Sequence, residues 1–354
     1  MKLDEAKTAY TFDDFYLEPQ HSRVKSRKDP GASTTIAGLS LKIPIVSAPM
    51  STVTDVEMSL AMHAAGGEAV VHRYMSVEDQ IEITKKIRTA LVDYQDSWLP
   101  FFAVGATGDF IERALDLHQH GVTKFCVDIA NGHNVICVDA VRWLLEVLPN
   151  SKIMAGNVCT YDGANSLVQA GVHVIRCGIG GGSICTTRQV TAHGVPQLTA
   201  IENCLQVKKF SDVSIIADGG IRHSGDIVKA IAVGADAVMI GGLLAGTDES
   251  PGATIRDADT GQLYKHYHGM ASEEARKEWF ESEDVSFVPE GTSFKVFHKG
   301  SAKKIIEQLV GGLKVGMSYS GVDNLVDLRA KAKWVRVTDN GRREANPNRK
   351  MFSR

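Results

Sequence analysis

From Ile43 onward the chain alternates short apolar runs, which end in Gly, Asn or Asp, with longer stretches whose apolar residues recur at helical spacing. This alternation is typical of repeated βα units around a parallel sheet, because each parallel strand needs a crossover back to the same edge. Eight apolar runs are candidate strands. They cover residues 43–48, 68–72, 101–104, 124–128, 152–155, 173–177, 214–217 and 237–240. Eight strands close a (β/α)8 barrel, so we predict an α/β TIM barrel.

Helical patterns lie between these runs. One covers residues 77–91, with Ser76 in position to cap its first turn, and another covers 111–120, before the break at Gly121. Active sites of such barrels form on the loops that follow the carboxyl ends of the strands. Functional residues are therefore expected just after each apolar run.

Three stretches fall outside the repeat. A polar amino-terminal arm runs to about Gly38, an insert at 248–299 follows the eighth strand, and a polar tail covers 338–354. The middle of the insert is charged and irregular, which favours a flap over the barrel mouth. We predict one catalytic domain over residues 1–354, with a poorly ordered or intersubunit tail.

Composition excludes several classes of partner. A formal net charge of −3 gives no basic field for nucleic acid or an anionic membrane. No run of about 18 apolar residues is present, and acids interrupt the place where a signal peptide would need an apolar stretch. We predict a cytoplasmic protein whose partners are small molecules and copies of itself.

The six cysteines form no CxxC pair, which favours reduced thiols over a disulfide framework or a zinc site. Five of them are expected to be small buried hydrophobic residues: Cys126, Cys137, Cys159, Cys177 and Cys204. Cys185 differs, because it lies in a polar, glycine-rich loop at the expected catalytic face. Paired histidines, His266 with His268 and His118 with His120, have no third ligand at a metal-motif spacing.

The loop with Cys185 reads GIGGGSICTTR, covers residues 178–188 and follows the sixth predicted strand. Its glycines permit backbone conformations that bring amides and carbonyls close to a ligand. A thiolate is a strong nucleophile when positive surroundings lower its pKa, and Arg188 is near in sequence. We predict that Cys185 is a catalytic nucleophile.

Glycine pairs follow the last two predicted strands, in ADGGIR and IGGLLAG. Backbone N–H groups at these positions of a barrel commonly bind phosphate. Gly219, Gly220, Gly241 and Gly242 are therefore candidate phosphate ligands, and Asp218 is a candidate for ribose hydroxyls. In the flap, Glu290 lies between Pro and Gly, and its spacing alone fits an exposed turn as well as an acid at the barrel mouth.

The chain resembles the IMP dehydrogenase and GMP reductase family over nearly its whole length. The segments that carry the resemblance are YTFDDFYLEPQHS, IPIVSAPMSTV, VDIANGH, MAGNV, GIGGGSICTTR, ADGGIR, GGLLAG and HGM. The resemblance implies a covalent adduct between Cys185 and purine C2, a nicotinamide cofactor, and a homotetramer with cofactor sites at subunit borders. It also implies potassium bound by the backbone of the Cys185 loop.

The resemblance favours GMP reductase, which converts GMP and NADPH to IMP and ammonia in purine salvage. Dehydrogenases of this family usually carry a regulatory (CBS) module after the second helix, and the run after Leu91 is too short for one. They also activate water with an Arg-Tyr pair, where this flap has Arg276 and Lys277. An IMP dehydrogenase without CBS modules, converting IMP and NAD to XMP and NADH, is the alternative. A nucleotide-binding regulator without turnover is a third reading.

The family match implies roles for individual residues. Cys185, Thr187 and Glu290 would be catalytic, with Thr187 and Glu290 as the proton-transfer pair. Nucleotide would bind to Ser183, Asp218, Gly219, Gly220, Gly241, Gly242, Gly269, Met270, Ala271 and Gly291. NADPH would bind to Ser26, Arg27, Arg73, Asp128, Ile129, Ala130, Ile179, Gly180, Ser318 and Tyr319. Potassium would bind to backbone atoms of Gly180, Gly182, Cys185 and Arg188. Gly181 in place of Pro, and Phe287 in place of a basic residue, depart from the family pattern.

Overall fold

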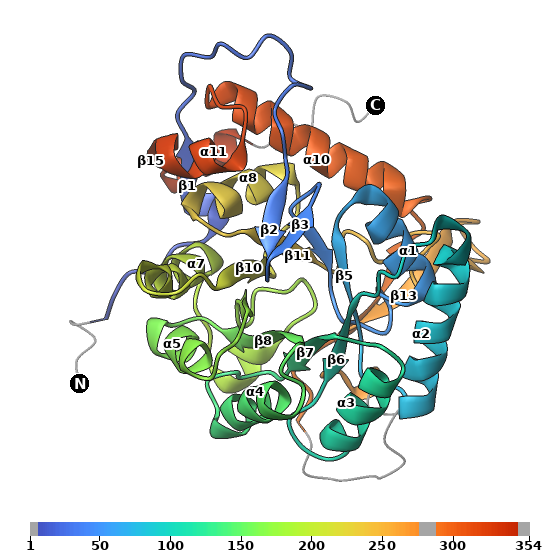
Figure 1. The fold of residues 1–354 in the computed structure, drawn as a ribbon. Helices are drawn as coiled ribbons and strands as arrows, with labels where there is room; N and C mark the ends of the chain where they lie inside the picture. The colour runs from blue at the N-terminus through green and yellow to red at the C-terminus, as the bar shows by residue number, and fades with distance from the viewer. Residues whose placement is uncertain (1–5, 276–287, 346–354) are drawn as a thin grey trace.

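A computed structural model describes residues 6–275 and 288–345 of the chain, and it contains the predicted closed barrel of eight parallel strands. In barrel order, the strands are β10 (Ser214–Asp218), β11 (Ala237–Ile240), β4 (Ile45–Ser47), β5 (Glu68–Val71), β6 (Phe101–Val104), β7 (Lys124–Asp128), β8 (Lys152–Val158) and β9 (Val174–Cys177). The helices form a ring outside the strands (Figure 1). The TIM-barrel prediction is therefore confirmed.

Helices connect the strands as the alternation predicts. They are α1 (Val56–Ala65), α2 (Val77–Leu91), α3 (Phe110–Gln119), α4 (Val135–Val147), α5 (Tyr161–Gln169), α6 (Thr187–Thr191), α7 (Gln197–Leu205) and α8 (Ser224–Val233). Ser76 caps α2 as predicted, because its hydroxyl accepts a hydrogen bond from the Asp79 amide at 3.0 Å. The connection from α2 to β6 consists of residues 92–100 and contains one short helix, η3 (Val92–Tyr94). No module is inserted there.

Five of the eight predicted strands have boundaries that differ from the structure, by one residue in β5, β9 and β10 and by more in β4 and β8. β4 begins at Ile45 because Pro44 has no N–H to donate to the ladder. β8 extends to Val158, three residues beyond the predicted end, because it keeps pairing with β9 after a register shift at Gly156. α3 begins and ends one residue earlier than predicted, at Phe110 and Gln119.

The apolar core has two layers. Side chains that point into the barrel, including Val70, Phe101 and Met154, form an inner cluster, and the opposite side chains pack between the strands and the helices. Because both faces are covered, β6 is buried at every position, which explains why it reads as a continuous apolar run.

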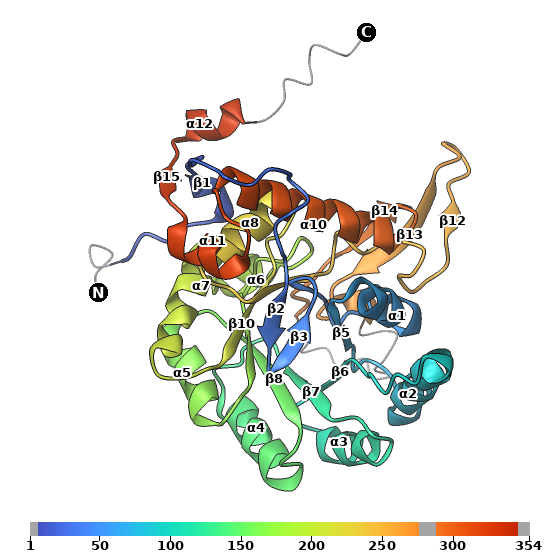
Figure 2. The ribbon, with the colours of Figure 1, turned by 45° about the horizontal axis from the view of Figure 1, so that its top comes forward.

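The amino-terminal arm closes one end of the barrel. A hairpin of β2 (Thr34–Ile36) and β3 (Leu39–Leu41) lies across the amino ends of the barrel strands, in front of them in Figure 1. Its Ile36 and Leu41 belong to the inner apolar cluster. Before it, the short helix η2 (Phe12–Asp14) leads into β1 (Phe15–Leu17), which pairs with the late strand β15 (Trp334–Arg336) (Figure 2). This closure leaves the opposite end of the barrel for the site.

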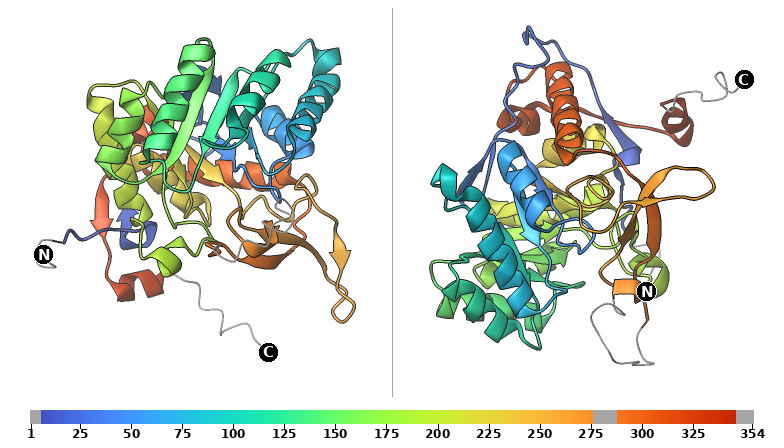
Figure 3. Two further views of the ribbon diagram at one scale, coloured as in Figure 1. Left: turned by 90° about the horizontal axis from the view of Figure 1, so that it is seen from below. Right: turned by 90° about the vertical axis from the view of Figure 1, so that its right-hand side faces the viewer.

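The flap contains regular strands on both sides of its charged middle, most of which lies outside the described residues. Within 248–299, β12 (Ile255–Arg256), β13 (Leu263–His268) and β14 (Ser293–Phe297) form an antiparallel sheet that protrudes from one side of the barrel (Figure 3). After the flap, α10 (Ala302–Tyr319) packs against α8 and α1, and α11 (Leu325–Lys331) follows. The predicted poorly ordered tail begins with a helix, α12 (Asp339–Glu344). Among the described residues, no helix combines the length and apolar character required to span a membrane.

A buried ion pair joins the amino ends of two barrel strands. Glu68, the first residue of β5, has a side chain 1% exposed and accepts a hydrogen bond from Nζ of Lys124, the first residue of β7, at 2.7 Å. Nζ of Lys124 also lies 5.1 Å from the ring centroid of Trp98. Burial raises the pKa of Glu68, and the Lys124 ammonium opposes that shift. At the end opposite the site, this pair has a structural role.

We expect Lys124→Met to lower the free energy of unfolding by about 3–5 kcal/mol, because it leaves the Glu68 carboxylate buried without a counter-charge. Urea denaturation followed by circular dichroism measures this loss. As a matched control, Arg142→Met removes the exposed Arg142–Asp139 pair and should cost less than about 1 kcal/mol. Adding Glu68→Gln to Lys124→Met should restore part of the stability. Equal losses for Lys124→Met and Arg142→Met would show that the buried pair is not the cause.

Candidate active site

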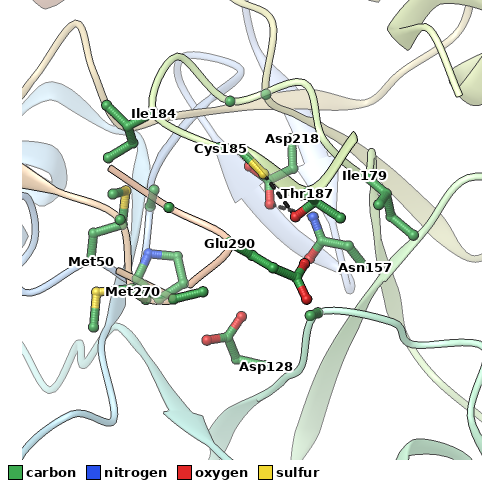
Figure 4. A pocket seen from close by; sticks show the side chains of 18 of the residues that line it. Met50, Asp128, Asn157, Ile179, Ile184, Cys185, Thr187, Asp218, Met270 and Glu290 are labelled. Carbon is green, nitrogen blue, oxygen red and sulfur yellow. Dashed lines mark hydrogen bonds between the residues drawn. The ribbon is translucent and has the colours of Figure 1, made fainter. Parts of the chain in front are cut away.

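Two adjoining cavities, of about 270 Å³ and about 480 Å³, lie at the carboxyl ends of the barrel strands. Their shared lining includes Met50, Gly182, Asp218 and Tyr267, so together they form one elongated site. The first is lined by the Cys185 loop, the ends of β7 and β8, and the flap residues Met270 and Glu290. Figure 4 shows its lining side chains. The second extends over the glycine pairs after β10 and β11.

Cys185 is half-buried and lines the first cavity. Its Sγ lies 3.1 Å from Oγ1 of Thr187, the first residue of α6 (Figure 4). The loop reaches this position through tight turns at Gly178 and Gly180, whose φ angles are +140° and +74°. The thiol and the hydroxyl are therefore in contact and open to a ligand.

The flap docks directly on this loop. Cys185 and Gly291 form an antiparallel bridge, the Thr186 amide donates to the Glu290 carbonyl at 2.9 Å, and the Thr292 amide donates to the Ile184 carbonyl at 3.0 Å. The Glu290 amide in turn donates to the Ala271 carbonyl at 3.0 Å. This clasp sets the Glu290 side chain in the same cavity as Cys185 and Thr187, pointing between Thr187, Asn157 and Asp128 (Figure 4). The sequence left open whether Glu290 lies in an exposed turn or at the barrel mouth, and in the structure it lies at the barrel mouth.

The floor of the site is a buried network around Arg176, on β9. Its guanidinium donates to Asp218 Oδ2 at 3.1 and 2.8 Å and pairs with Asp128 on its other side. Asn157 Nδ2 donates to the same Asp218 oxygen at 2.8 Å. Burial opposes the charge, yet the carboxylates of Asp128 and Asp218 raise the pKa of Arg176 well above its usual value. One fixed cation thus holds two cavity-lining carboxylates in place.

The second cavity has the features of an anion site. Gly219 and Gly220 adopt φ angles of +95° and +79°, which favour glycine, and they precede α8. At Gly242, an added Cβ would lie 2.9 Å from Ser183 Oγ and 3.4 Å from Tyr267 Oη, so two hydroxyls converge there. After Gly241 and Gly242 the chain makes turns and bends, so a helix follows the first glycine pair alone.

Two cations lie next to the glycine pairs of this cavity, and both are hydrogen-bonded to protein atoms. Arg222 lines it, but its guanidinium donates to Asp13 of the arm at 2.9 and 2.6 Å, and to Asp226 of α8 at 3.2 Å. Lys299 donates from Nζ to the Gly242 carbonyl at 2.7 Å. Both interactions fix the backbone next to the glycine pairs.

The residues expected to bind a dinucleotide separate into two groups. Six of them line the first cavity: Arg73, Asp128, Ile129, Ala130, Ile179 and Gly180. The other four, Ser26, Arg27, Ser318 and Tyr319, lie on the arm and at the end of α10, outside the lining of both cavities. This second group is itself compact, because the Arg27 guanidinium lies 5.5 Å from the centroid of the Tyr319 ring.

Arg188 does not contact the thiol as its position in sequence suggested. Its guanidinium donates to the carbonyls of Ile179 at 3.1 Å and Val195 at 2.7 Å, so it braces the loop from behind. The other cysteines contrast with Cys185. Cys126, Cys137, Cys177 and Cys204 are buried as expected, whereas Cys159 is half-buried. Burial raises the pKa of Cys126 to about 12, which keeps that thiol protonated.

Sequence reasoning missed several lining residues, namely Met50, Tyr74, Asn157, Arg176 and Tyr267. Each follows or ends a strand, or lies beside a glycine segment, which is the signal that could have identified them. Arg176 was the hardest to find, because it reads as part of an apolar strand. Three flap residues that bear on the choice between activities, Arg276, Lys277 and Phe287, lie outside the described residues.

Comparisons with known proteins agree with this architecture. The profile of the family described as "IMP dehydrogenase / GMP reductase domain" matches residues 9–348. Inosine-5'-monophosphate dehydrogenase of Methanocaldococcus jannaschii is 34% identical, with 98% of this chain and 96% of that protein covered. The enzyme of the same name from Cryptosporidium parvum is 37% identical, with 95% and 94% covered.

A solved structure is similar throughout. It is a variant of GMP reductase from Trypanosoma brucei in complex with guanosine 5'-monophosphate, with a TM-score of 0.90 and 29% identity. The match covers 98% of this chain and 99% of that one. The similar proteins thus include both named activities. By its sequence, its barrel and its full-length match to the family profile, this chain belongs to the IMP dehydrogenase and GMP reductase family of oxidoreductases.

Proposed function

We propose that this protein is a GMP reductase, which converts GMP to IMP and ammonia with oxidation of NADPH. The observation that carries the proposal is the grouping of Cys185, Thr187 and Glu290 in one cavity, with Sγ and Oγ1 3.1 Å apart. A nucleophile next to a hydroxyl and a carboxyl group is what displacement of an amine requires. The likeness to a GMP reductase solved with GMP over nearly the whole chain supports it.

In this proposal, the Cys185 thiolate adds to C2 of the purine. Thr187 and Glu290 transfer a proton to the 2-amino group, the C2–N bond breaks, and ammonia leaves. The nicotinamide dinucleotide, when bound, supplies the hydride that reduces C2. The C2–S bond then breaks, its electron pair returns to sulfur, and IMP is released. Capture of the purine by sulfur divides one difficult displacement into two steps.

The nucleotide would extend across both cavities. Its phosphate would accept hydrogen bonds from amides of Gly220, Gly241 and Gly242 and from the Ser183 and Tyr267 hydroxyls, since these groups converge on the second cavity. Asn157 and Arg176 donate to Oδ2 of Asp218, and in this proposal its Oδ1 accepts a hydrogen bond from a ribose hydroxyl. Gly219, Gly269, Met270, Ala271 and Gly291 line the space between, where the base would lie.

The dinucleotide would bind to the other half of the first cavity. The Arg73 guanidinium and the Asp128 carboxylate are there to meet its polar groups, with Ile129, Ala130, Ile179 and Gly180 beside them. We propose that Ser26, Arg27, Ser318 and Tyr319 meet the same ligand from a neighbouring subunit of a cytoplasmic homotetramer. Arg27 is a cation suited to the 2′-phosphate of NADPH.

We also propose that the Cys185 loop binds potassium through backbone atoms of Gly180, Gly182, Cys185 and Arg188. Two turns with positive φ in this loop, at Gly178 and Gly180, are compatible with carbonyls that converge on a small cation. In the described part of the chain, no three His, Cys, Asp or Glu side chains are grouped to hold a metal. Carbonyl oxygens are thus the ligands that remain for a cation here.

IMP dehydrogenase is the second candidate, favoured by the names of the relatives that are 34% and 37% identical. It uses the same sulfur and the same C2 centre, with hydride transfer in the opposite direction and hydrolysis of the adduct. The alignment with the M. jannaschii protein runs over 481 positions, more than the 354 residues of this chain. That relative therefore has residues without a counterpart here, and the short connection at 92–100 fits this difference.

We expect the purified protein to oxidise NADPH when GMP is present, because Thr187 and Glu290 serve amine departure. The decrease in nicotinamide absorbance at 340 nm, with chromatographic detection of IMP and ammonia, measures the reaction. The matched assay contains IMP and NAD. Reduction of NAD with formation of XMP, and no GMP-dependent oxidation, would identify the dehydrogenase instead. Nucleotide binding without turnover in either assay would identify a regulator.

We expect Cys185→Ala to abolish turnover and to prevent formation of a covalent nucleotide adduct, since no other described thiol lines either cavity. Mass spectrometry of the acid-quenched enzyme detects the adduct and the modified peptide. Cys159→Ala is the control, because Cys159 is also half-buried but lies away from the site, and it should keep the adduct. An adduct on another residue, or full activity of Cys185→Ala, would contradict the mechanism.

We expect Thr187→Ala and Glu290→Gln each to lower kcat by about 10²–10⁴-fold, the usual size of a general acid contribution. Nucleotide affinity should change little, because neither side chain is proposed to hold phosphate or ribose. Steady-state kinetics and equilibrium binding of GMP separate the two effects. Glu274→Gln, a second flap carboxylate outside both cavities, should have normal kcat. Loss of GMP affinity equal to the loss of kcat would assign these residues to binding.

A further inference from the structure

We infer that Arg113 and Gln80, which lie outside the lining of both cavities, are positioning residues for Arg73. The segment after β5 carries Arg73 and Tyr74 into the first cavity. It is a short stretch between β5 and α2, so its shape depends on what holds its two ends. Two buried polar side chains from the surrounding helices hold them.

Gln80, on α2, holds the first end. Its side chain is fully buried, and Nε2 donates to the His72 carbonyl at 2.8 Å and to the Ala103 carbonyl of β6 at 3.1 Å. One amide group therefore ties the residue before Arg73 to the neighbouring barrel strand. Buried amides keep such bonds because an unpaired donor or acceptor in the interior costs free energy.

Arg113, on α3, holds the second end. Its Nη2 donates to the Met75 carbonyl at 2.8 Å, and its Nη1 donates to Gln80 Oε1 at 2.9 Å. Arg113 is 5% exposed, whereas the side chain of its ion-pair partner Asp109 is 49% exposed. The ion pair alone could form at the surface. The buried position is explained by the bonds to Met75 and Gln80, which need the fixed geometry of a guanidinium.

Because the carbonyls of His72 and Met75 are held in this way, the direction of the Arg73 side chain between them is also fixed. Its Nε donates to the Asp128 carbonyl at 3.3 Å, and its guanidinium carbon lies 5.0 Å from the centroid of the Tyr74 ring. An added Cβ at Gly105 would lie 3.6 Å from Arg73 Nη1, so the guanidinium passes beside the backbone that follows β6. A small shift of the segment would move the guanidinium away from Asp128 and from any ligand there.

This inference rests on the proposed function, in which Arg73 contacts the nicotinamide dinucleotide. We expect Arg113→Met to raise the dissociation constant of NADPH by about tenfold, the scale of coupling between residues in one hydrogen-bond network. GMP affinity should stay within about twofold, because the nucleotide groups lie on other strands. Fluorescence titration of NADPH and equilibrium binding of GMP measure both without turnover. Asp109→Asn removes the ion pair, keeps both fixed ends, and should leave both affinities unchanged.

A double-mutant cycle separates positioning from general destabilisation. In an Arg73→Met background, Arg113→Met should have no further effect on NADPH affinity. Equal effects in both backgrounds, or parallel losses of NADPH and GMP affinity, would overturn the inference while leaving the proposed function intact. If Arg113→Met does not fold, Gln80→Met gives the same comparison through the His72 end. A wild-type protein that binds no nicotinamide dinucleotide would overturn the inference and the proposed function together.

Discussion

The hydrogen bonds that join β11 to β10 on one side and to β4 on the other close the sheet of this protein. Closure has one main consequence: the carboxyl ends of all eight parallel strands meet around a single opening. Residues as distant in sequence as Met50, Asp128 and Cys185 thereby line one cavity. The hairpin of β2 and β3 covers the other end, so the carboxyl ends of the strands form the end that is open to ligands.

Charge at the rim is arranged around Arg176. A buried guanidinium would be unfavourable alone, but Asp128 and Asp218 balance it from two neighbouring directions. In return, both carboxylates are held rigid, with Asp218 facing the half of the site proposed for the nucleotide and Asp128 facing the half proposed for the dinucleotide. The two ligands would thus be oriented by one network, which favours a fixed distance between reacting centres.

The flap completes the chemistry that the barrel begins. Residues 290–292 bond to the backbone of residues 184–186, and this clasp is what adds a carboxyl group to the thiol and hydroxyl of the loop. The groups proposed to be catalytic therefore come from both the barrel and the flap. In the proposed function, flap residues on the same barrel would decide between amine displacement and hydrolysis at purine C2.

The sequence alone predicted the barrel, because buried parallel strands read as apolar runs and amphipathic helices read at a 3.6-residue period. It also separated Cys185 from the other thiols, since a polar glycine-rich loop offers no burial. Local pattern could not predict the role of Arg176, Arg113 or Gln80, whose partners are far away in sequence, nor that Arg188 would brace the loop instead of contacting the thiol. The position of Glu290 stayed open for the same reason. Periodicity reports which face of an element is buried, but only the folded chain decides which distant groups share a cavity, because those contacts depend on closure of the whole barrel.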